Sequence, residues 1–342
     1  MSMNRREFLK RSLGGAAVGA TAAGDAQAFS LARQDKQLPP QALGMLYDST
    51  VCVGCKACVS ACKQANGQPA AMPAELARWN EGTWDSAQDL DGRTLNVIKA
   101  FVDGTREVKD RETDGFAFVK RHCLHCVDPS CVSVCPVSAM KKDPKTGVVT
   151  YNKDACIGCR YCSYGCPFGV PQFDLTVPFG RINKCEMCSH LLAKGGIPAC
   201  CDVCPTGASL FGPVAALQEE AEARLAAKAG SRYEFPRGSL TEKRPRYEGV
   251  VAQYAGGVYG VKDGGGTQVR YLAAVSFEKL GLPKLPEHSF AAIAEGVQHT
   301  IYKGFIAPLA LFGGLVVLAW RAVRRAPPDP GRSDPSHGSR PS

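Results

Sequence analysis

The most continuous apolar segment of the chain lies close to its C-terminus. Residues 304–320 carry no charged side chain, and three arginines follow within residues 321–325. Seventeen residues is the short limit for a helix that crosses about 30 Å of hydrocarbon, and Tyr302 and Trp320 stand where interfacial aromatic residues are found. We therefore predict one transmembrane helix over residues 301–321, with its arginine-rich end in the cytoplasm. A buried core helix is the alternative interpretation.

The N-terminus has the pattern of an export signal. Arg5 and Arg6 form a twin-arginine region, residues 12–23 are small and weakly apolar, and an Ala-Gln-Ala sequence ends at Ala28. These parts in this order are typical of a bacterial Tat signal peptide, so residues 1–28 are predicted to be removed on export. The Tat pathway exports folded proteins, which suits a protein whose cofactor is inserted in the cytoplasm. A basic amphipathic helix is the alternative.

Between these ends, short apolar segments predict an α+β domain. Residues 148–151 have a strand pattern after a turn at residues 143–147, and residues 206–212 have the pattern of another short strand. A helical pattern follows over residues 214–229, and the glycine-rich residues 256–266 are typical of a loop. Each strand follows a cysteine-rich run. This order of run and strand occurs twice, which indicates a repeated unit.

The net charge of +9 does not indicate a nucleic-acid-binding protein. Residues 1–28 carry +2 and residues 321–342 carry +3, so the remaining body carries only +4, without a basic block that could follow a phosphate backbone. The sequence also has no P-loop, no strand-bound G-x-G-x-x-G and no C-x-x-C-H haem motif. Nucleic acid, nucleotide and c-type haem are therefore excluded as expected ligands.

Sixteen of the seventeen cysteines fall into four runs. Two runs have the spacing C-x2-C-x2-C-x3-C, one has C-x2-C-x4-C-x3-C, and the fourth is split by eleven residues. In bacterial ferredoxins the first three cysteines of such a run bind one [4Fe-4S] cluster, and the fourth binds the other cluster of a pair. The runs are Cys52, Cys55, Cys58 and Cys62; Cys123, Cys126, Cys131 and Cys135; Cys156, Cys159, Cys162 and Cys166; and Cys185, Cys188, Cys200 and Cys204.

Crossed ligation between the two outer runs and between the two inner runs predicts four [4Fe-4S] clusters. Site 1 is Cys52, Cys55, Cys58 and Cys204; site 2 is Cys123, Cys126, Cys131 and Cys166; site 3 is Cys156, Cys159, Cys162 and Cys135; site 4 is Cys185, Cys188, Cys200 and Cys62. Cys201 is left over, because the x3 spacing to Cys204 favours Cys200 as the ligand. With about −2 from each oxidised cluster and its thiolates, the loaded body becomes mildly acidic.

Zinc and disulfide bonds are the alternative uses of these cysteines. A four-cysteine zinc site needs two C-x2-C pairs and leaves the other cysteines of each run without a function. Disulfides form in exported proteins, but neighbouring C-x2-C positions would make strained and redundant bridges. Iron-sulfur clusters account for the whole pattern. His122 and His125 lie by the second run and could donate hydrogen bonds to a cluster, but we expect them to be solvated loop residues.

The chain resembles the four-cluster iron-sulfur subunits of bacterial respiratory oxidoreductases, and most closely the HybA-type subunits of periplasmic, hydrogenase-2-like [NiFe]-hydrogenases. The resemblance is carried by LGMLYDST at residues 43–50, HCVDPSCVSVCPVSA from His125, KDPKTG from Lys142, GGGTQV from Gly264 and QHTIYKG from Gln298. It implies two tandem or interleaved bacterial-ferredoxin-like 2[4Fe-4S] modules in an α+β fold with a single C-terminal transmembrane helix. The split fourth run departs from the family, because it is shorter between its second and third cysteines.

The resemblance also implies a function in anaerobic respiration without catalytic activity of the chain's own. Electrons would pass from the small subunit of a [NiFe]-hydrogenase, which is bound to its large subunit, to an integral membrane subunit that reduces quinone. The alternatives are the beta subunit of a formate dehydrogenase or related molybdenum oxidoreductase and, more remotely, a zinc-binding structural membrane protein. The expected parts are a signal peptide at 1–28, a cluster domain at 29–215 with an insertion at about 63–122, a periplasmic extension at 216–300, the helix at 301–321 and a disordered cytoplasmic tail at 322–342.

Overall fold

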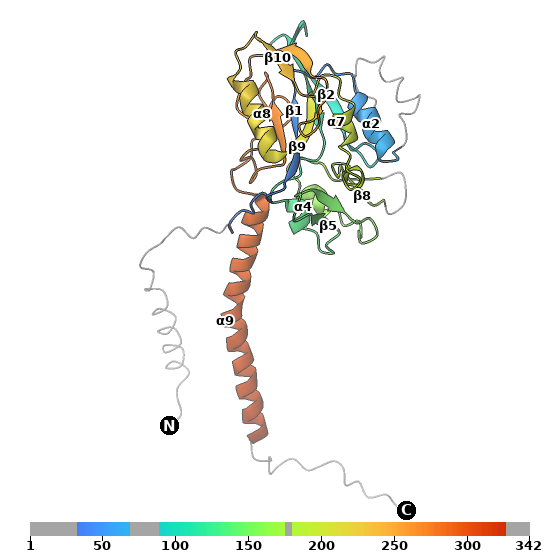
Figure 1. Ribbon diagram of the computed structural model, residues 1–342. Helices are drawn as coiled ribbons and strands as arrows, with labels where there is room; N and C mark the ends of the chain where they lie inside the picture. Colours follow the sequence, from blue (N-terminus) through green and yellow to red (C-terminus); the bar gives the residue numbers. More distant parts are fainter. Residues whose placement is uncertain (1–32, 69–88, 175–179, 326–342) are drawn as a thin grey trace, which may run out of the picture. The chain divides into compact units, whose positions relative to one another are not determined.

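The computed structural model describes residues 33–68, 89–174 and 180–325 (Figure 1). The predicted signal peptide lies outside the described residues, and so does the predicted tail from residue 326 onward. The chain divides into a compact unit, Ala32–Glu295, and a second unit whose described part is residues 296–325. All seventeen cysteines belong to the compact unit.

A four-stranded sheet with the order β11-β9-β1-β13 forms the centre of the compact unit (Figure 1). Strand β1, Leu43–Asp48, pairs antiparallel with β9, Ser209–Pro213, and parallel with β13, Val269–Leu272, while β11, Gly238–Ser239, pairs with β9. The strand predicted over residues 206–212 is confirmed as β9, shifted by a few residues. Because β1 lies between the other strands, nearly all of its residues are buried, as expected of a central strand covered on both faces.

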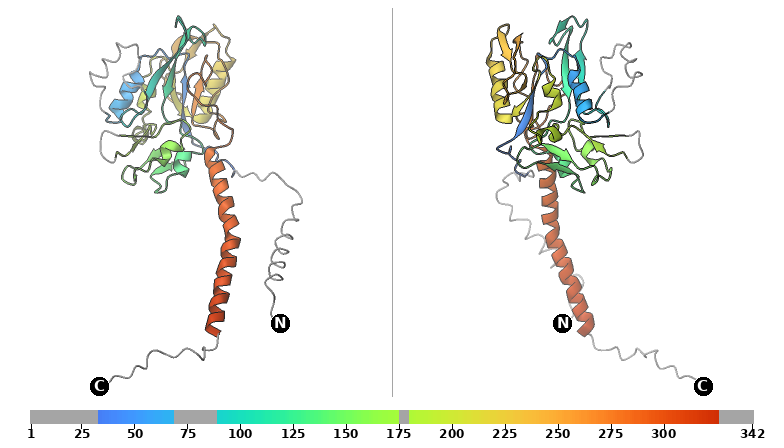
Figure 2. Two further views of the ribbon diagram at one scale, coloured as in Figure 1. Left: turned by 180° about the vertical axis from the view of Figure 1, so that it is seen from behind. Right: turned by 45° about the vertical axis from the view of Figure 1, so that its right-hand side comes forward.

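Helix α8, Val214–Ala226, covers one face of this sheet (Figure 2). It confirms the predicted helical pattern and ends three residues earlier. Its Leu217 and Ala221 pack against one buried leucine from each of three strands, Leu46, Leu210 and Leu272. Arg224 of the same helix is fully buried, and its Nη1 atom lies 3.0 Å from the Oδ2 atom of Asp48, which is also fully buried. The helix therefore contributes both apolar packing and a buried ion pair.

A second sheet, with the order β2-β4-β3, packs on the other face (Figure 2). Its strands are β2, Val97–Val102, β3, Val108–Lys109, and β4, Gly115–Arg121. Two paired tyrosines of the central sheet reach across to it: the hydroxyl of Tyr47 donates to the carbonyl of Phe118, and that of Tyr271 donates to the carbonyl of Lys120. The segment predicted as an insertion thus supplies the sheet that lies against the central one.

The remaining described strands form three two-stranded antiparallel sheets. The hairpin predicted before the third cysteine run is confirmed by the antiparallel pairing of β5, Met140–Lys142, with β6, Val149–Tyr151. The other pairs are β7, Gln172–Phe173, with β8, Ile182–Asn183, and β10, Arg232–Phe235, with β12, Tyr247–Val250. The short helices α2, Ala57–Ala65, α4, Ser130–Ser133, α5, Tyr161–Tyr164, α6, Ser189–Leu192, and α7, Ala199–Asp202, lie in or next to the cysteine runs.

The segment beyond residue 215 belongs to the same compact unit as the cysteine runs. It supplies β11 and β13 to the central sheet, and the amide of Gln268 donates to the carbonyls of Leu43 and Thr146. The glycine-rich residues 256–266 form a loop, as predicted, which leads into β13. The extension is therefore part of the scaffold that surrounds the cysteines.

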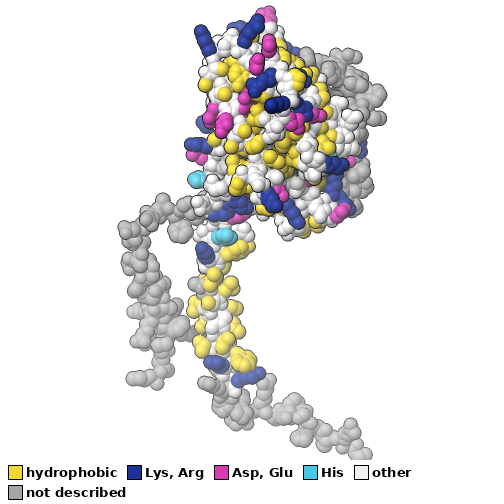
Figure 3. Space-filling view, in the orientation of Figure 1, with side chains coloured by type: hydrophobic (Ala, Val, Ile, Leu, Met, Phe, Trp, Pro, Cys, Tyr) yellow, Lys and Arg dark blue, Asp and Glu magenta, His cyan; other side chains and the backbone are white. Residues whose placement is uncertain are grey.

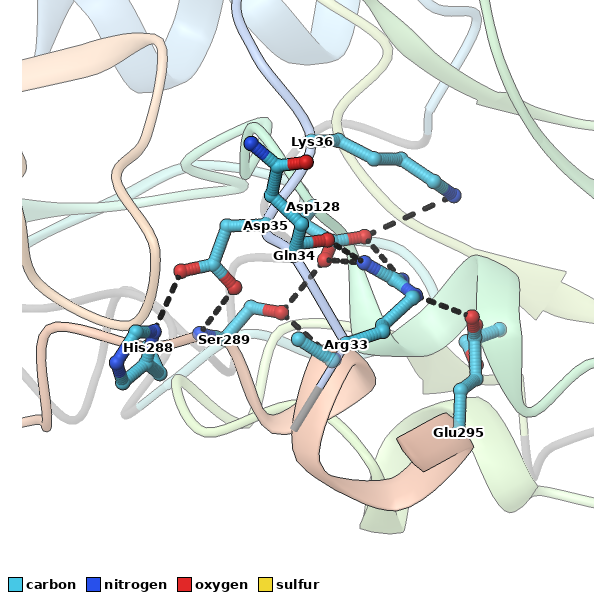
Figure 4. A network of polar contacts seen from close by, with 10 residues as sticks. Arg33, Gln34, Asp35, Lys36, Asp128, His288, Ser289 and Glu295 are labelled. Carbon is cyan, nitrogen blue, oxygen red and sulfur yellow. Dashed lines mark hydrogen bonds and ion pairs between the residues drawn. The ribbon is translucent and has the colours of Figure 1, made fainter. Parts of the chain in front are cut away.

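A polar network ties the first described residues to the beginning of the last helix (Figure 4). The guanidinium of Arg33 donates to both carboxylate oxygens of Asp128, at 2.7 and 2.9 Å, and to Glu295 at 2.6 Å. The hydroxyl of Ser289 donates to Asp128 at 2.6 Å, and the backbone amide of Ser289 donates to Asp35. Asp128 lies between the second and third cysteines of the second run. The network thus connects three distant parts of the sequence within the compact unit.

Helix α9, Phe290–Arg325, contains the predicted transmembrane segment and extends beyond it at both ends. Among the described residues it is the one helix long and apolar enough to cross a membrane, with a mean hydropathy of 1.9 over its most apolar part. Figure 3 shows apolar side chains along this helix, with basic side chains towards its end. Pro308 lies inside the helix.

Candidate iron-sulfur sites

The third cysteine of every run occupies the same position in a helix. It is the second residue of α2, α4, α5 and α7, which places the fourth cysteine about one turn further along the chain. These third cysteines are Cys58, Cys131, Cys162 and Cys200. In α7 the residue at this position is Cys200, and Cys201 is the next residue.

The first two cysteines of every run are joined by the same backbone turn. The second residue between them has a left-handed conformation in all four runs, at Gly54, His125, Gly158 and Met187, with φ between 48° and 71°. At Gly54 a Cβ atom would lie 2.5 Å from the ring of Phe118, so both the conformation and the space require glycine. The four runs therefore share one local geometry, although their sequences differ.

The cysteines of site 1 surround a cavity. Cys52, Cys55 and Cys58 of the first run line about 320 Å³ of empty space together with Cys204 of the fourth run. Burial raises the pKa of Cys58 to about 12; the charge of Lys120 opposes this rise, and neighbouring thiolates, including Cys204, add to it. The structure thus brings together the four residues that the sequence assigns to site 1.

A second cavity of similar size is lined by the four cysteines of site 4. They are Cys185, Cys188 and Cys200 of the fourth run and Cys62 of the first run. Cys201 is fully buried. Side-chain hydrogen bonding with Cys201 and the charge of Lys120 lower the pKa of Cys200. A thiolate held in this way is a ready ligand for iron.

The inner sites show the same crossing of runs. Burial is the largest cause that raises the pKa of Cys126, followed by the thiolate of Cys166, which comes from the other inner run. At site 3, burial and the thiolates of Cys156 and Cys159 raise the pKa of Cys162 to about 11. Cys135, the predicted fourth ligand of site 3, packs with Cys156 against one buried apolar group that contains Cys162.

Hydrogen-bond donors point at several of the sulfurs. Backbone amides donate to Cys52, Cys135, Cys185 and Cys204 over 3.2–3.5 Å, and the side-chain amide of Asn66 donates to Cys62 at 3.6 Å. Such donors stabilise thiolates and the sulfur atoms of an iron-sulfur cluster. Within the described residues no group of three His, Cys, Asp or Glu side chains is arranged to hold a single metal ion. The residues present fit a cluster with several iron atoms.

Thiolates of one predicted site shift the pKa values of cysteines in a neighbouring predicted site. The thiolate of Cys200 at site 4 raises the pKa of Cys58 at site 1, after burial. In the same way Cys123 of site 2 acts on Cys185 of site 4, and Cys162 of site 3 acts on Cys131 of site 2. Electrostatic forces weaken with distance, so these pairs identify neighbouring sites. For the predicted sites, these pairs favour the order site 1, site 4, site 2, site 3.

Comparison with known proteins identifies the family. The profile of the 4Fe-4S dicluster domain matches residues 115–214. The chain is 47% identical over 327 residues to the hydrogenase-2 operon protein HybA of Escherichia coli O157:H7, and this match covers 94% of the chain and 96% of that protein. The chain belongs to the HybA family. It is also 30% identical over 280 residues to the formate dehydrogenase iron-sulfur subunit of Haemophilus influenzae, covering 80% and 78% of the two chains.

Membership of the HybA family confirms the general class of the protein. The chain has a 4Fe-4S ferredoxin-like domain within a mixed helix and sheet fold, and it is an iron-sulfur protein of electron transport. The assignment of single cysteines to sites stays a prediction, because neither the family profile nor the relatives specify ligands.

The expectation that His122 and His125 are solvated is wrong for this HybA-family chain. Both side chains are buried, because the second run lies inside the compact unit. The Nδ1 atom of His125 accepts a hydrogen bond from the amide of Val149, so its Nε2 atom carries the proton; among the described residues that atom has no acceptor. His122 lines the cavity of site 4. The unpaired N–H group of His125 lies next to predicted cysteine ligands and is suited to donate a hydrogen bond to a cluster sulfur.

Two cysteines of the HybA-family chain are exposed, Cys55 of site 1 and Cys159 of site 3. The other fifteen cysteines are buried or partly buried. Sites 1 and 3 are also the two ends of the order given above. Both exposed residues are the second cysteine of the two runs with the spacing C-x2-C-x2-C-x3-C, whereas the second cysteines of the other two runs are buried or partly buried.

Proposed function

We propose that this chain conducts electrons through four [4Fe-4S] clusters, held at sites 1 to 4, from the small subunit of a periplasmic [NiFe]-hydrogenase to a membrane subunit that reduces quinone. A [4Fe-4S] cluster supplies reversible one-electron transfer. The observation that carries the proposal is the fourfold repetition of one turn and one helix register, with the last cysteine of each run next to its partner run. In this proposal the chain carries electrons and does not itself make or break bonds of a substrate.

The electrons would follow the order site 1, site 4, site 2, site 3, or its reverse. Interior sites are buried, which excludes water and oxidants, and the end sites each have one exposed cysteine through which a partner protein can approach. In this arrangement the outer runs form one ferredoxin-like module and the inner runs form another, interleaved with it. The protein's role is to hold successive clusters close enough for transfer.

Helix α9 would anchor the protein in the bacterial inner membrane. Its length and hydropathy support a membrane-spanning helix, and the positive-inside rule favours a cytoplasmic location for Arg321 and Arg324. The cysteine-containing unit would then lie on the periplasmic side, in agreement with the twin-arginine signal. One helix offers too little surface for a quinone pocket, so a separate membrane subunit is required.

The hydrogenase partner is favoured over a molybdenum enzyme by similarity. Identity to the hydrogenase-2 operon protein is 47%, whereas identity to the formate dehydrogenase iron-sulfur subunits is 30%. Purification of the tagged full-length chain from its native membrane, with detergent, tests this choice. Co-purification of [NiFe]-hydrogenase large and small subunits supports the proposal, and co-purification of a molybdenum enzyme contradicts it.

A cysteine variant tests the electron path in the purified complex. We expect the wild-type chain to contain about sixteen irons, four from each cluster. Cys131→Ser removes a ligand of site 2, an interior site, so it should abolish hydrogen-dependent quinone reduction while leaving hydrogen oxidation with an artificial dye intact. Cys201→Ser is the matched control and should retain both activities. Unimpaired quinone reduction in Cys131→Ser would refute the electron path, and a colourless protein that contains zinc would refute the cluster assignment.

A further inference from the structure

Lys120 is a fully buried cation without a carboxylate partner. It lies in β4, its side chain belongs to the largest fully buried ones of the described residues, and its Nζ atom donates to the hydroxyl of Ser209 at 3.1 Å. No ion pair joins it to an aspartate or glutamate of the described chain, unlike buried Arg224, which pairs with Asp48. A buried ammonium is unstable unless a negative charge lies nearby.

The neighbours of Lys120 show that it stands between two cysteine sites. Ser209 and Ile98, the residue paired with Lys120 across the β2–β4 ladder, both line the cavity of site 1. The backbone amide of Ser209 also donates to Cys204 of site 1 at 3.4 Å. His122, two residues further along the chain from Lys120, lines the cavity of site 4. Lys120 therefore occupies the wall that separates site 1 from site 4.

The charges that act on Lys120 come from cysteines of both sites. Burial lowers its pKa, but the thiolates of Cys200, Cys201 and Cys58 outweigh burial and leave the pKa well above its ordinary value. Cys58 belongs to site 1 and Cys200 to site 4. In the other direction, the charge of Lys120 lowers the pKa of Cys200. Cysteines of both sites are therefore the negative groups that act on the ammonium of Lys120.

We propose that Lys120 is a positioning residue that sets the reduction potentials of the clusters at sites 1 and 4, by placing one fixed positive charge between them. This inference rests on the proposed function, because it requires clusters at both sites. Reduction adds one negative charge to a cluster, so a nearby cation favours the reduced form. Two elementary charges about 8 Å apart, at an effective dielectric constant of about 20, change such an equilibrium by roughly thirtyfold. Because both clusters share the cation, their potentials shift together.

The test is a redox titration of the purified full-length chain, followed by electron paramagnetic resonance. Lys120→Met removes the charge and keeps most of the side-chain volume. We expect the ratio of reduced to oxidised cluster, at a fixed potential, to fall at least tenfold for two of the four clusters, which is 59 mV for one electron. For the other two clusters, the ratio of reduced to oxidised cluster at the same potential should change by less than threefold. Lys120→Arg retains the charge. In this variant the ratio of reduced to oxidised cluster should change by less than threefold for all four clusters.

A matched control is Lys279→Met, since Lys279 is a partly exposed lysine that pairs with Glu112 and should leave all four titrations unchanged. Unchanged potentials in Lys120→Met, or an equal shift of all four clusters, would overturn the proposal. Loss of two clusters in both Lys120→Met and Lys120→Gln, with four clusters kept in Lys120→Arg, would support the requirement for a positive charge. Loss of clusters in Lys120→Arg as well would indicate a packing role and overturn the proposal. A wild-type chain without iron would instead refute the proposed function itself.

Discussion

Removal of Arg33 should destabilise the compact unit, because it leaves the buried carboxylate of Asp128 without its arginine partner. The side chain of Asp128 is 1% exposed and that of Arg33 is 20% exposed, and two hydrogen bonds join them. Breaking a buried ion pair from one side costs about 3–5 kcal/mol. The bond from Ser289 and the ammonium of Lys36, 3.7 Å away, remain in Arg33→Ala. We therefore expect a loss of about 2–3 kcal/mol, below the full cost of a broken buried pair.

The assay is thermal unfolding of the cluster-loaded protein at a fixed scan rate, followed by visible absorbance and near-ultraviolet circular dichroism. A loss of this size should lower the Tm by about 7 °C for a unit of this length. The fixed scan rate matters because unfolding of a cofactor protein is irreversible. Arg244→Ala is the matched control: it removes an arginine from a solvent-exposed pair with Asp202 and should cost less than about 1 kcal/mol.

The stability difference between the wild type and Arg33→Ala should depend on pH through the carboxyl group of Asp128. In the wild type burial raises the pKa of Asp128, but the hydrogen bonds from Arg33 and Ser289 outweigh it and leave the pKa below 3.8. The carboxylate is therefore ionised and stabilising at every pH above about 4, and its contribution is lost only as the pH falls through the lowered pKa. Without Arg33, burial dominates and raises that pKa. The difference between the two proteins should be constant from about pH 8 to pH 6 and smaller near pH 5.

A double-mutant cycle decides whether the two residues act through each other. Asp128→Asn removes the charge that Arg33 compensates, so Arg33→Ala should cost much less in that background. Equal losses in the two backgrounds would refute the reasoning, and so would a Tm shift no larger than that of Arg244→Ala.

Two further predictions concern a ligand choice and a close backbone approach. Cys200→Ala should lose about four irons per chain, and Cys201→Ala should keep about sixteen; the reverse result would assign Cys201 to site 4. Gly44→Ala should prevent accumulation of folded protein, because its Cβ would overlap the carbonyl of Gln268 on the neighbouring strand, whereas Gly212→Ala meets only the side chain of Leu240 at 3.3 Å. Soluble yield and circular dichroism check the second pair, and equal folding of both variants would contradict it.

The elements that sequence patterns predicted correctly are local ones. The hairpin of β5 and β6, the strand β9 and the helix α8 each follow from a turn or a periodic pattern within about fifteen residues. The same is true of the cysteine runs, since their spacing already requires the turn that the structure shows four times. The boundary expected near residue 215 had no such local basis: the segment after it adds two strands to the sheet that contains β1.

Burial and charge at the sites could not be predicted from spacing. The sequence around His122 and His125 is typical of a solvated loop, yet both side chains are buried. Lys120 follows four apolar residues in β4, and its position between two sites depends on Ser209, almost ninety residues later in the chain. Pairwise electrostatic effects of this kind need distances, and distances need the packed structure.

By itself the sequence determined the four cysteine runs with ferredoxin spacing and the apolar C-terminal helix, and it predicted an export signal, because each of these patterns depends on residues that lie within one turn, one helix or one short segment. The tertiary structure alone decided which histidines are buried and which buried lysine lies near two of the predicted sites. Those features arise where segments far apart in the chain pack together, and the energy of a charge or a hydrogen bond depends on that packing.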